Sequence, residues 1–349
     1  MAFARAIVAA YARYGQSPAG VLRLAQITPA QLHKPEGRIT AAQMEVLSGA
    51  AMQELDDEGL GAFGRRLPWG SYGMLARASL SAPDLGLALK RWCRHHALIT
   101  DDIALRVAVS GATATIAIEE RRDLGAAREF CLVHVLRNIH GLACWYIDSR
   151  IPLQGARFPF DAPPHAAAYP LLFPGPLSFG APQATSTGSG QAPSTGSGQA
   201  PSTGSGQAAI QFDARYLALP LRRDEKALGQ MLKHALPLTV LQYRRDRLLV
   251  EQVRQALAAD PARGHNATQL ADLLNVSPRT LHRQLKEEGA SLQRLKDEVR
   301  FAIAKDILNR TDKPIKQVAT AAGFGNDKSF ARAFRAWTGT TPAEFRNRS

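Results

Sequence analysis

Apolar residues in the first 60 positions recur every three or four residues, which predicts short amphipathic helices. Phe3, Ile7 and Tyr11, for example, fall on one face of a helix. A loop is expected over residues 65–75, because Pro, Gly and Ser interrupt the pattern there. A further helix is expected to begin at Asp84. The N-terminal part of the chain is therefore predicted to be mainly helical.

The spacing changes after Leu98 to the alternation that is typical of strands. Apolar residues at alternate positions flank a Ser110-Gly111 turn: Ile103, Leu105, Val107 and Val109 before it, and Ile116 and Ile118 after it. This pattern predicts a β-hairpin with one buried face. Residues 128–147 return to helical spacing, and short strands are expected around 156–160, 177–179 and 210–212. Residues 1–240 are thus predicted to form an α+β domain.

One pattern occurs twice in the last eighty residues. Its copies are QLADLLNVSPRTLHRQLK, at 269–286, and QVATAAGFGNDKSFARAFR, at 317–335. Ala271 aligns with Ala319 at an offset of 48, and Arg283 aligns with Arg332 at an offset of 49. A repeat of this length indicates one supersecondary unit used twice.

Each copy has the spacing of a helix, a sharp turn and a second helix. Asn275 tolerates the left-handed backbone at the end of the first helix, Ser277 can cap the second, and Pro278 suits its first position. Leu281 and Leu285 point inward at helical spacing. The polar residues left facing outward are Arg279, Thr280, His282, Arg283 and Lys286 in the first copy, and Asn326, Asp327, Lys328, Ser329, Arg332 and Arg335 in the second.

Two helices with a basic outer face on the second form the helix-turn-helix geometry, which enters the major groove of double-stranded DNA. A small helical bundle with a solvated basic face would show the same spacing once. Two matched copies favour DNA binding over that alternative.

The run Gly323 to Arg346, GFGNDKSFARAFRAWTGTTPAEFR, resembles the C-terminal signature of the AraC/XylS transcription regulators. The resemblance implies an all-α DNA-binding domain over residues 241–349. Within it, two helix-turn-helix units, near 267–288 and 315–337, would flank a linker helix at 291–309. Arg279, His282 and Arg283 are expected to face base edges. Asp327, Lys328, Ser329 and Arg332 match the base-contacting helix of the family.

Residues 65–118 resemble, more loosely, the arabinose-binding-like N-terminal domain of the ornithine-utilisation type of AraC regulators. That likeness implies a small-molecule effector and a homodimer, with RNA polymerase as a further candidate partner. Trp69, Tyr72, His95 and His96 are candidate effector-binding residues, although core packing would explain each nearly as well. A purely structural dimerisation domain is the alternative.

The distribution of charge agrees with DNA as a partner. The net charge is +13, and residues 240–349 hold 20 Lys and Arg against 12 Asp and Glu, compared with 23 against 18 in the first 239 residues. Cys93, Cys131 and Cys144 have no zinc-site spacing and are expected to be reduced core residues. No targeting or membrane-spanning segment is visible, so a cytoplasmic protein is expected.

No enzyme, metal or cofactor is expected. The sequence has no HExxH, no GxSxG and no Gly-rich phosphate loop, and His134 and His140 lie on different faces of their helix. Some AraC-type domains occur in DNA-repair proteins that accept alkyl groups on a cysteine, but no cysteine follows Cys144. A non-specific RNA-binding or chromatin protein would need exposed aromatics, whereas Phe330, Phe334 and Trp337 have core spacing.

Residues 185–208 contain a repeated STGSGQAP, which is typical of a flexible coil inserted into a loop of the N-terminal domain. Deleting Ser186 to Pro201, two whole repeats, is expected to change the melting temperature and DNA affinity little, because loop-closure entropy varies slowly with length. Differential scanning calorimetry and operator titration would measure both quantities. A melting temperature lower by many degrees would show that the segment packs.

Overall fold

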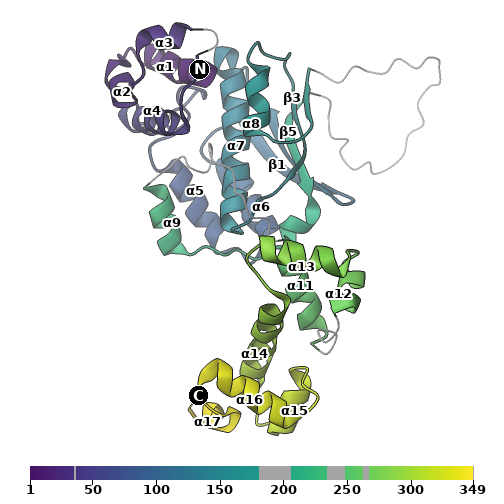
Figure 1. The fold of residues 1–349 in the computed structure, drawn as a ribbon. Helices are drawn as coiled ribbons and strands as arrows, with labels where there is room; N and C mark the ends of the chain where they lie inside the picture. Colours follow the sequence, from purple (N-terminus) through teal and green to yellow (C-terminus); the bar gives the residue numbers. More distant parts are fainter. Residues whose placement is uncertain (35–36, 181–205, 234–247, 262–266, 349) are drawn as a thin grey trace, which may run out of the picture. The chain divides into compact units, whose positions relative to one another are not determined.

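The computed structural model describes residues 1–34, 37–180, 206–233, 248–261 and 267–348. The chain divides into two compact units, residues 1–244 and 245–349, each with its own core (Figure 1). The domain boundary expected between residues 240 and 241 lies outside the described residues, as does most of the insertion expected at 185–208. Its last residue, Ala208, is instead the first residue of a strand.

Four short helices open the first unit: α1 (Ala2–Arg13), α2 (Ala19–Leu24), α3 (Pro29–His33) and α4 (Ala41–Glu54). Thr28 and Thr40 each form a capping box with a Gln three residues later, which fixes where α3 and α4 begin. Ile7, Tyr11 and Leu47 are among the fully buried residues of their shared core. The mainly helical start of the chain is confirmed.

The helix α5 (Ser71–Leu80) corrects the loop expected at 65–75. Gly70, with a φ of 101°, makes the turn into α5, and the Glu58 carboxylate accepts hydrogen bonds from the amides of Gly70 (2.8 Å) and Tyr72 (2.5 Å). A cap supplied from twelve residues upstream has no local signature. The helix α6 (Leu85–His96) begins at the Asp84 cap, as predicted.

Five strands form one sheet in the order β1-β2-β5-β3-β4, and every neighbouring pair is antiparallel except β3–β4. The strands are β1 (Ile103–Ser110), β2 (Thr113–Glu120), β3 (Leu153–Phe158), β4 (Leu177–Phe179) and β5 (Ala208–Asp213). The long helix α7 (Arg128–Tyr146) contacts β2 and β5, and α6 contacts β1. A short helix, α8 (Tyr169–Leu172), precedes β4, and α9 (Glu225–Leu232) packs on α5. Short 3-10 helices lie at Gly125–Ala127, Ala166–Ala168 and Ala214–Ala218.

The hairpin of β1 and β2 differs from its prediction at the far end. Only the first three residues of β1, from Ile103 to Leu105, are buried, whereas Val109 is 57% exposed. β1 lies at the edge of the sheet, with a hydrogen-bonded neighbour on one side only. Alternation fixed which face each side chain occupies, but not how far along the strand the covering elements extend.

Over its described residues, the C-terminal unit contains helices alone: α11 (Leu248–Ala259), α12 (Ala267–Leu273), α13 (Pro278–Glu287), α14 (Leu292–Arg310), α15 (Ile315–Ala321), α16 (Asp327–Thr338) and α17 (Pro342–Arg348). Two hydrophobic cores of this unit form around the two ends of α14. Leu295 and Val299 belong to the first core, Ala304 and Leu308 to the second, and Ile303 packs against both. The predicted classes, α+β followed by an all-α unit with a long connecting helix, are confirmed.

Candidate DNA interface and ligand cavity

The first helix-turn-helix unit is formed by α12 and α13. Asn275 adopts a φ of 55° in the turn, and the Ser277 hydroxyl accepts a hydrogen bond from the Thr280 amide at 3.1 Å. Leu281 and Leu285 are buried, which turns the opposite face of α13 outward. That face carries the predicted residues: Arg279, His282, Arg283 and Lys286 are exposed, and Thr280 is half-buried.

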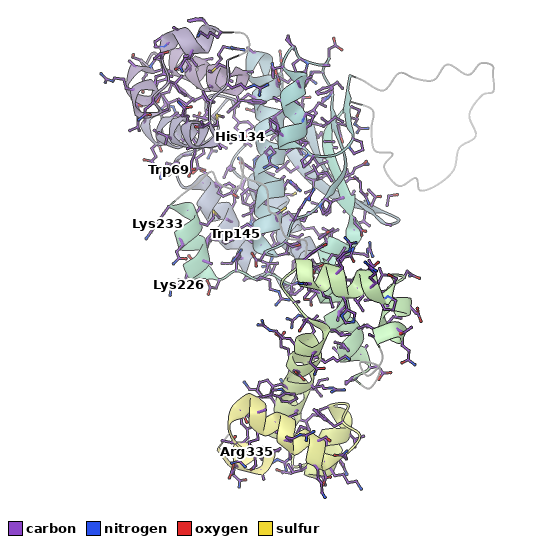
Figure 2. The ribbon with its side chains drawn as sticks, in the orientation of Figure 1. Trp69, His134, Trp145, Lys226, Lys233 and Arg335 are labelled. Atoms are coloured by element: carbon purple, nitrogen blue, oxygen red, sulfur yellow. The ribbon has the colours of Figure 1, made fainter. Side chains whose placement is uncertain are left out.

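The second helix-turn-helix unit is formed by α15 and α16 and is built in the same way. Gly323, at a φ of 75°, takes the place of Asn275, and the Asn326 side chain caps α16 by accepting from the Ser329 amide at 2.8 Å. Phe330 and Phe334 are fully buried. The outward face again holds the predicted set, with Asn326, Asp327, Lys328, Arg332 and Arg335 exposed and Ser329 half-buried. Figure 2 labels Arg335 on this helix.

Both helix-turn-helix units make side-chain contacts within the C-terminal unit, and these contacts differ in strength. Arg283 lies 3.4 Å from Glu287 one turn along α13, and both side chains are about 60% exposed. Such an exposed pair is weak and can be given up to another anion. Arg300 of α14 donates a hydrogen bond to the Gly323 carbonyl at 3.2 Å, and its guanidinium lies 4.8 Å from the centre of the Phe324 ring. Arg300 therefore links the turn of the second helix-turn-helix unit to the connecting helix α14.

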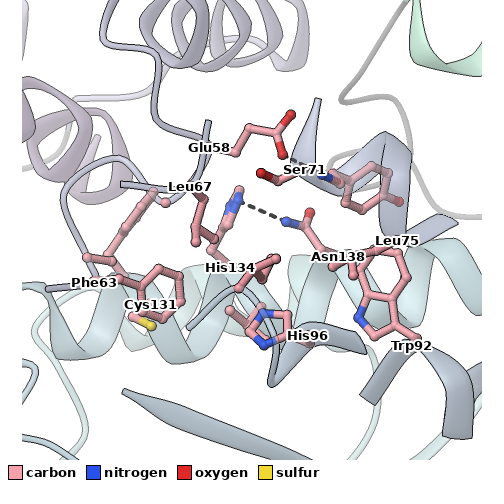
Figure 3. Close-up of a pocket in the computed structure, with 16 residues that line it drawn as sticks. Glu58, Phe63, Leu67, Ser71, Leu75, Trp92, His96, Cys131, His134 and Asn138 are labelled. Carbon is pink, nitrogen blue, oxygen red and sulfur yellow. Dashed lines mark hydrogen bonds between the residues drawn. The ribbon is translucent and has the colours of Figure 1, made fainter. Parts of the chain in front are cut away.

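A separate site lies inside the first unit. A cavity of about 60 Å³ is lined by the segment after α4 and by α5, α6 and α7 (Figure 3). We call this space the inner chamber. Its walls are mainly apolar and aromatic, and they include Phe63, Leu67, Leu75, Trp92 and Ile99. Concave apolar spaces with a few polar groups are the usual form of small-molecule sites.

Two histidines supply polar groups to the inner chamber. His96 is only 6% exposed, and no described residue provides a hydrogen-bond partner for its Nδ1. His134 Nε2 lies 2.9 Å from Asn138 Nδ2, one turn further along α7. Burial lowers the pKa of His96 and of His134 to about 4, so both rings are neutral near pH 7.

Glu58 lies in a turn that is stabilised by the neighbouring residue, Asp57. The buried Asp57 carboxylate accepts hydrogen bonds from the amides of Gly59, Gly61 and Leu67, and the Glu58 amide donates to the Leu67 carbonyl at 2.7 Å. The Glu58 carboxylate in turn caps α5. Burial raises the pKa of Glu58, against the effect of these two amides.

A second cavity, of about 180 Å³, shares four lining residues with the inner chamber: Glu58, Tyr72, His134 and Asn138. We call it the outer chamber. Trp69 and Gly73 line it from the α5 side, and Leu232, the last residue of α9, lines it from the other. A Cβ atom on Gly73 would lie 3.0 Å from Leu232 Cδ1, so the absence of a side chain there allows α9 to approach.

Three of the four predicted effector-binding residues line these chambers. Trp69 lines the outer one, His96 the inner one and Tyr72 both. His95, one residue earlier on α6, lines neither. Sequence reasoning did not single out Glu58 or Asn138, and it considered His134 only as a metal ligand. The i, i+4 spacing of His134 and Asn138 on an apolar helix was a usable signal.

Among the residues that the structure describes, no helix is long and apolar enough to cross a membrane. The same residues include no group of three or more His, Cys, Asp or Glu that could bind a metal ion. Cys93, Cys131 and Cys144 are buried, as expected, and none of them forms a disulfide with another described residue.

Comparison with known proteins places both units. The arabinose-binding domain of AraC transcription regulators matches residues 15–186, and a helix-turn-helix domain matches residues 270–348. The ornithine utilization regulator of Pseudomonas aeruginosa is 27% identical, over 99% of this chain and 95% of that protein. The transcriptional activator RhaS of an Enterobacter species is 37% identical over 22% of this chain and 28% of that protein.

Among solved structures, the transcriptional regulator CdpR from Pseudomonas aeruginosa is 22% identical and covers 95% of this chain and 96% of its own. The TM-score of that pair is 0.33, which supports no comparison of sites. The family matches, which together span more than half of the chain, agree with the α+β unit, the paired helix-turn-helix units and the signature of α16. The chain belongs to the AraC family of DNA-binding transcription regulators.

Proposed function

We propose that this regulator acts on transcription in response to a small molecule bound in the two chambers of its first unit. The observation that carries the proposal is His96, which lines the inner chamber and whose buried Nδ1 has no hydrogen-bond partner among the described residues. A buried polar atom left unsatisfied costs roughly 1–3 kcal/mol, and a bound ligand can offset that cost. An effector would act by binding one arrangement of the protein better than another.

The DNA contacts in this proposal come from the exposed faces of α13 and α16. In the first helix-turn-helix unit, base edges would be contacted by Arg279, His282 and Arg283. In the second helix-turn-helix unit they would be contacted by Lys328 and Arg332. Arginine suits this role because it can bind guanine O6 and N7 together. Asp327 can only accept hydrogen bonds, so cytosine N4 is its most suitable partner. Thr280, Lys286, Asn326, Ser329 and Arg335 complete the interface, with the amides at the start of α16 suited to a phosphate oxygen.

Residues 1–240 would also form a homodimer, which places two DNA-binding domains, residues 241–349, on two half-sites. RNA polymerase is the further partner if the protein is an activator, as the name of the relative RhaS suggests for that protein. Regulation rather than catalysis is the role in this proposal, in line with the relatives named above.

The full chain is therefore expected to melt at a higher temperature with the right metabolite, and the same compound is expected to change its affinity for operator DNA. Bound genomic fragments would supply the operator, and a thermal-shift screen would supply the compound. Ornithine is included because a relative is named for its use. If a broad screen gives no shift and operator occupancy in cells ignores growth conditions, the first unit is a structural dimerisation domain.

A further inference from the structure

The charges around the two chambers restrict the ligand. Of the described residues that line them, Glu58 is the single acidic side chain, and the amides of Gly70 and Tyr72 favour its ionised form. Neither set contains Lys or Arg, and His96 and His134 are neutral there. A ligand carboxylate would lose its water beside Glu58 without a cation to pair with, which is unfavourable. A ligand with one positive charge would meet the ionised carboxylate of Glu58, which lines both chambers.

The geometry of Glu58 allows such a contact. Its two carboxylate oxygens accept one backbone amide each, from Gly70 and Tyr72. Each carboxylate oxygen has two lone-pair directions, so the group keeps capacity for donors from a ligand. Because Asp57 and the start of α5 fix the position of Glu58, little ordering of the protein is needed on binding.

Aromatic side chains line the same two chambers. Tyr72 lines both chambers and packs edge-to-face on Trp92, with ring centres 5.1 Å apart, and Trp69 lines the outer chamber. Ammonium groups bind favourably within about 6 Å of an aromatic ring face. Figure 3 shows Glu58, Trp92 and the His134–Asn138 pair around one space.

The far end of the inner chamber is different. His96 lies edge-to-face with Phe63, at 6.3 Å between ring centres, and its Nδ1 is the unpartnered atom described above. A second charge beside this neutral, buried ring would be costly, whereas a hydroxyl or amide can complete its hydrogen bonding.

We infer that the ligand is a primary amine whose short apolar body ends in an uncharged hydrogen-bonding group, with the ammonium at Glu58 and the other end at His96. This inference rests on the proposed effector function and narrows it to a chemical class. Amino alcohols and hydroxyphenyl-alkylamines belong to that class, and fatty acids and intact zwitterionic amino acids do not.

The test uses the full chain and two matched series. One is 5-aminopentanol with its diol and its hydroxy acid, and the other is tyramine with tyrosol and 4-hydroxyphenylacetate. Isothermal titration and thermal shift are expected to rank amine above alcohol and alcohol above acid. Loss of a hydrogen-bonded charge partner should weaken binding about 10- to 100-fold, so alcohols should bind that much more weakly than amines. An acid that binds as well as its amine, or no response to any of the six compounds, overturns the assignment.

Variants locate the two ends of the ligand. Glu58→Gln should remove the difference between amine and alcohol, and His96→Phe should remove the advantage of tyramine over phenethylamine. His95→Phe is the matched control, because His95 lines neither chamber. A folded Glu58→Gln variant that still prefers the amine over the alcohol contradicts the inference. If that variant does not fold, the ranking of amine, alcohol and acid on the wild-type protein decides alone. A metabolite of another class that stabilises the chain would leave the effector function standing and refute only the amine.

Discussion

Replacement of Arg332 by alanine is expected to weaken specific operator binding by roughly 5- to 150-fold, the range for one bidentate contact to guanine. The side chain is exposed on the outer face of α16, while Phe330 and Phe334 anchor the opposite face in the core. Removing it should therefore leave the fold intact. Fluorescence anisotropy with the operator and with a scrambled duplex would measure both affinities.

Arg332→Lys separates the two possible roles of this residue. Lysine keeps the charge but lacks the planar fork, so a base contact should lose most of its specificity in this variant, whereas a phosphate contact should be nearly retained. Arg283→Ala, in the first helix-turn-helix unit, should weaken operator binding to a similar extent as Arg332→Ala. The base preference that it relaxes should lie at a different position of the operator. Equal loss on operator and scrambled DNA would mean that the residue meets phosphate, and wild-type affinity in a folded variant would refute the contact.

Replacement of Gly323 by alanine is expected to destabilise the DNA-binding unit by about 2–5 kcal/mol. Gly323 has a φ of 75°, which is unfavourable for any residue with a side chain, and its Cβ would lie 2.6 Å from the Pro261 carbonyl oxygen. That oxygen belongs to the backbone and cannot simply rotate away. A fall in melting temperature of about 10 °C or more should follow, with weaker DNA binding at 37 °C.

Gly325→Ala is the matched control for this prediction. Gly325 lies two residues further on, and a Cβ atom there would meet nothing within 4 Å. Its substitution should leave the melting temperature nearly unchanged. If Gly323→Ala has the same melting temperature as Gly325→Ala and the wild type, the close approach of the turn to Pro261 does not exist in solution.

Local sequence was sufficient to predict the helix-turn-helix units. Asn275 and Gly323 mark the left-handed turns, Ser277 caps its helix, and the apolar residues of each core recur within one or two turns. Each of these signals acts between residues fewer than eight positions apart. The two outward faces could therefore be named before any tertiary contact was known.

The cavity could not be predicted in the same way, because its walls come from four segments that are spread over residues 58–138. Tyr72 and His96 were candidates by residue type, but nothing near Glu58 indicates that it caps α5 and faces the same space as His134. The sequence likewise gave no measure of how far the cover over β1 extends, which is why Val109 was expected to be buried. Long-range contacts decided both points.

Helix α14 determines which genetic changes the DNA-binding unit can tolerate. Its 19 residues belong first to one core and then to the other, with Ile303 at the crossing point. One residue inserted at that point would rotate one helix-turn-helix unit against the other by about 100° and shift it by about 1.5 Å. Point mutations can therefore alter which bases each unit prefers, one contact at a time. The number of base pairs between the two contacted segments, in contrast, is inherited with the length of α14, so operators of descendants should diverge in sequence while keeping that spacing.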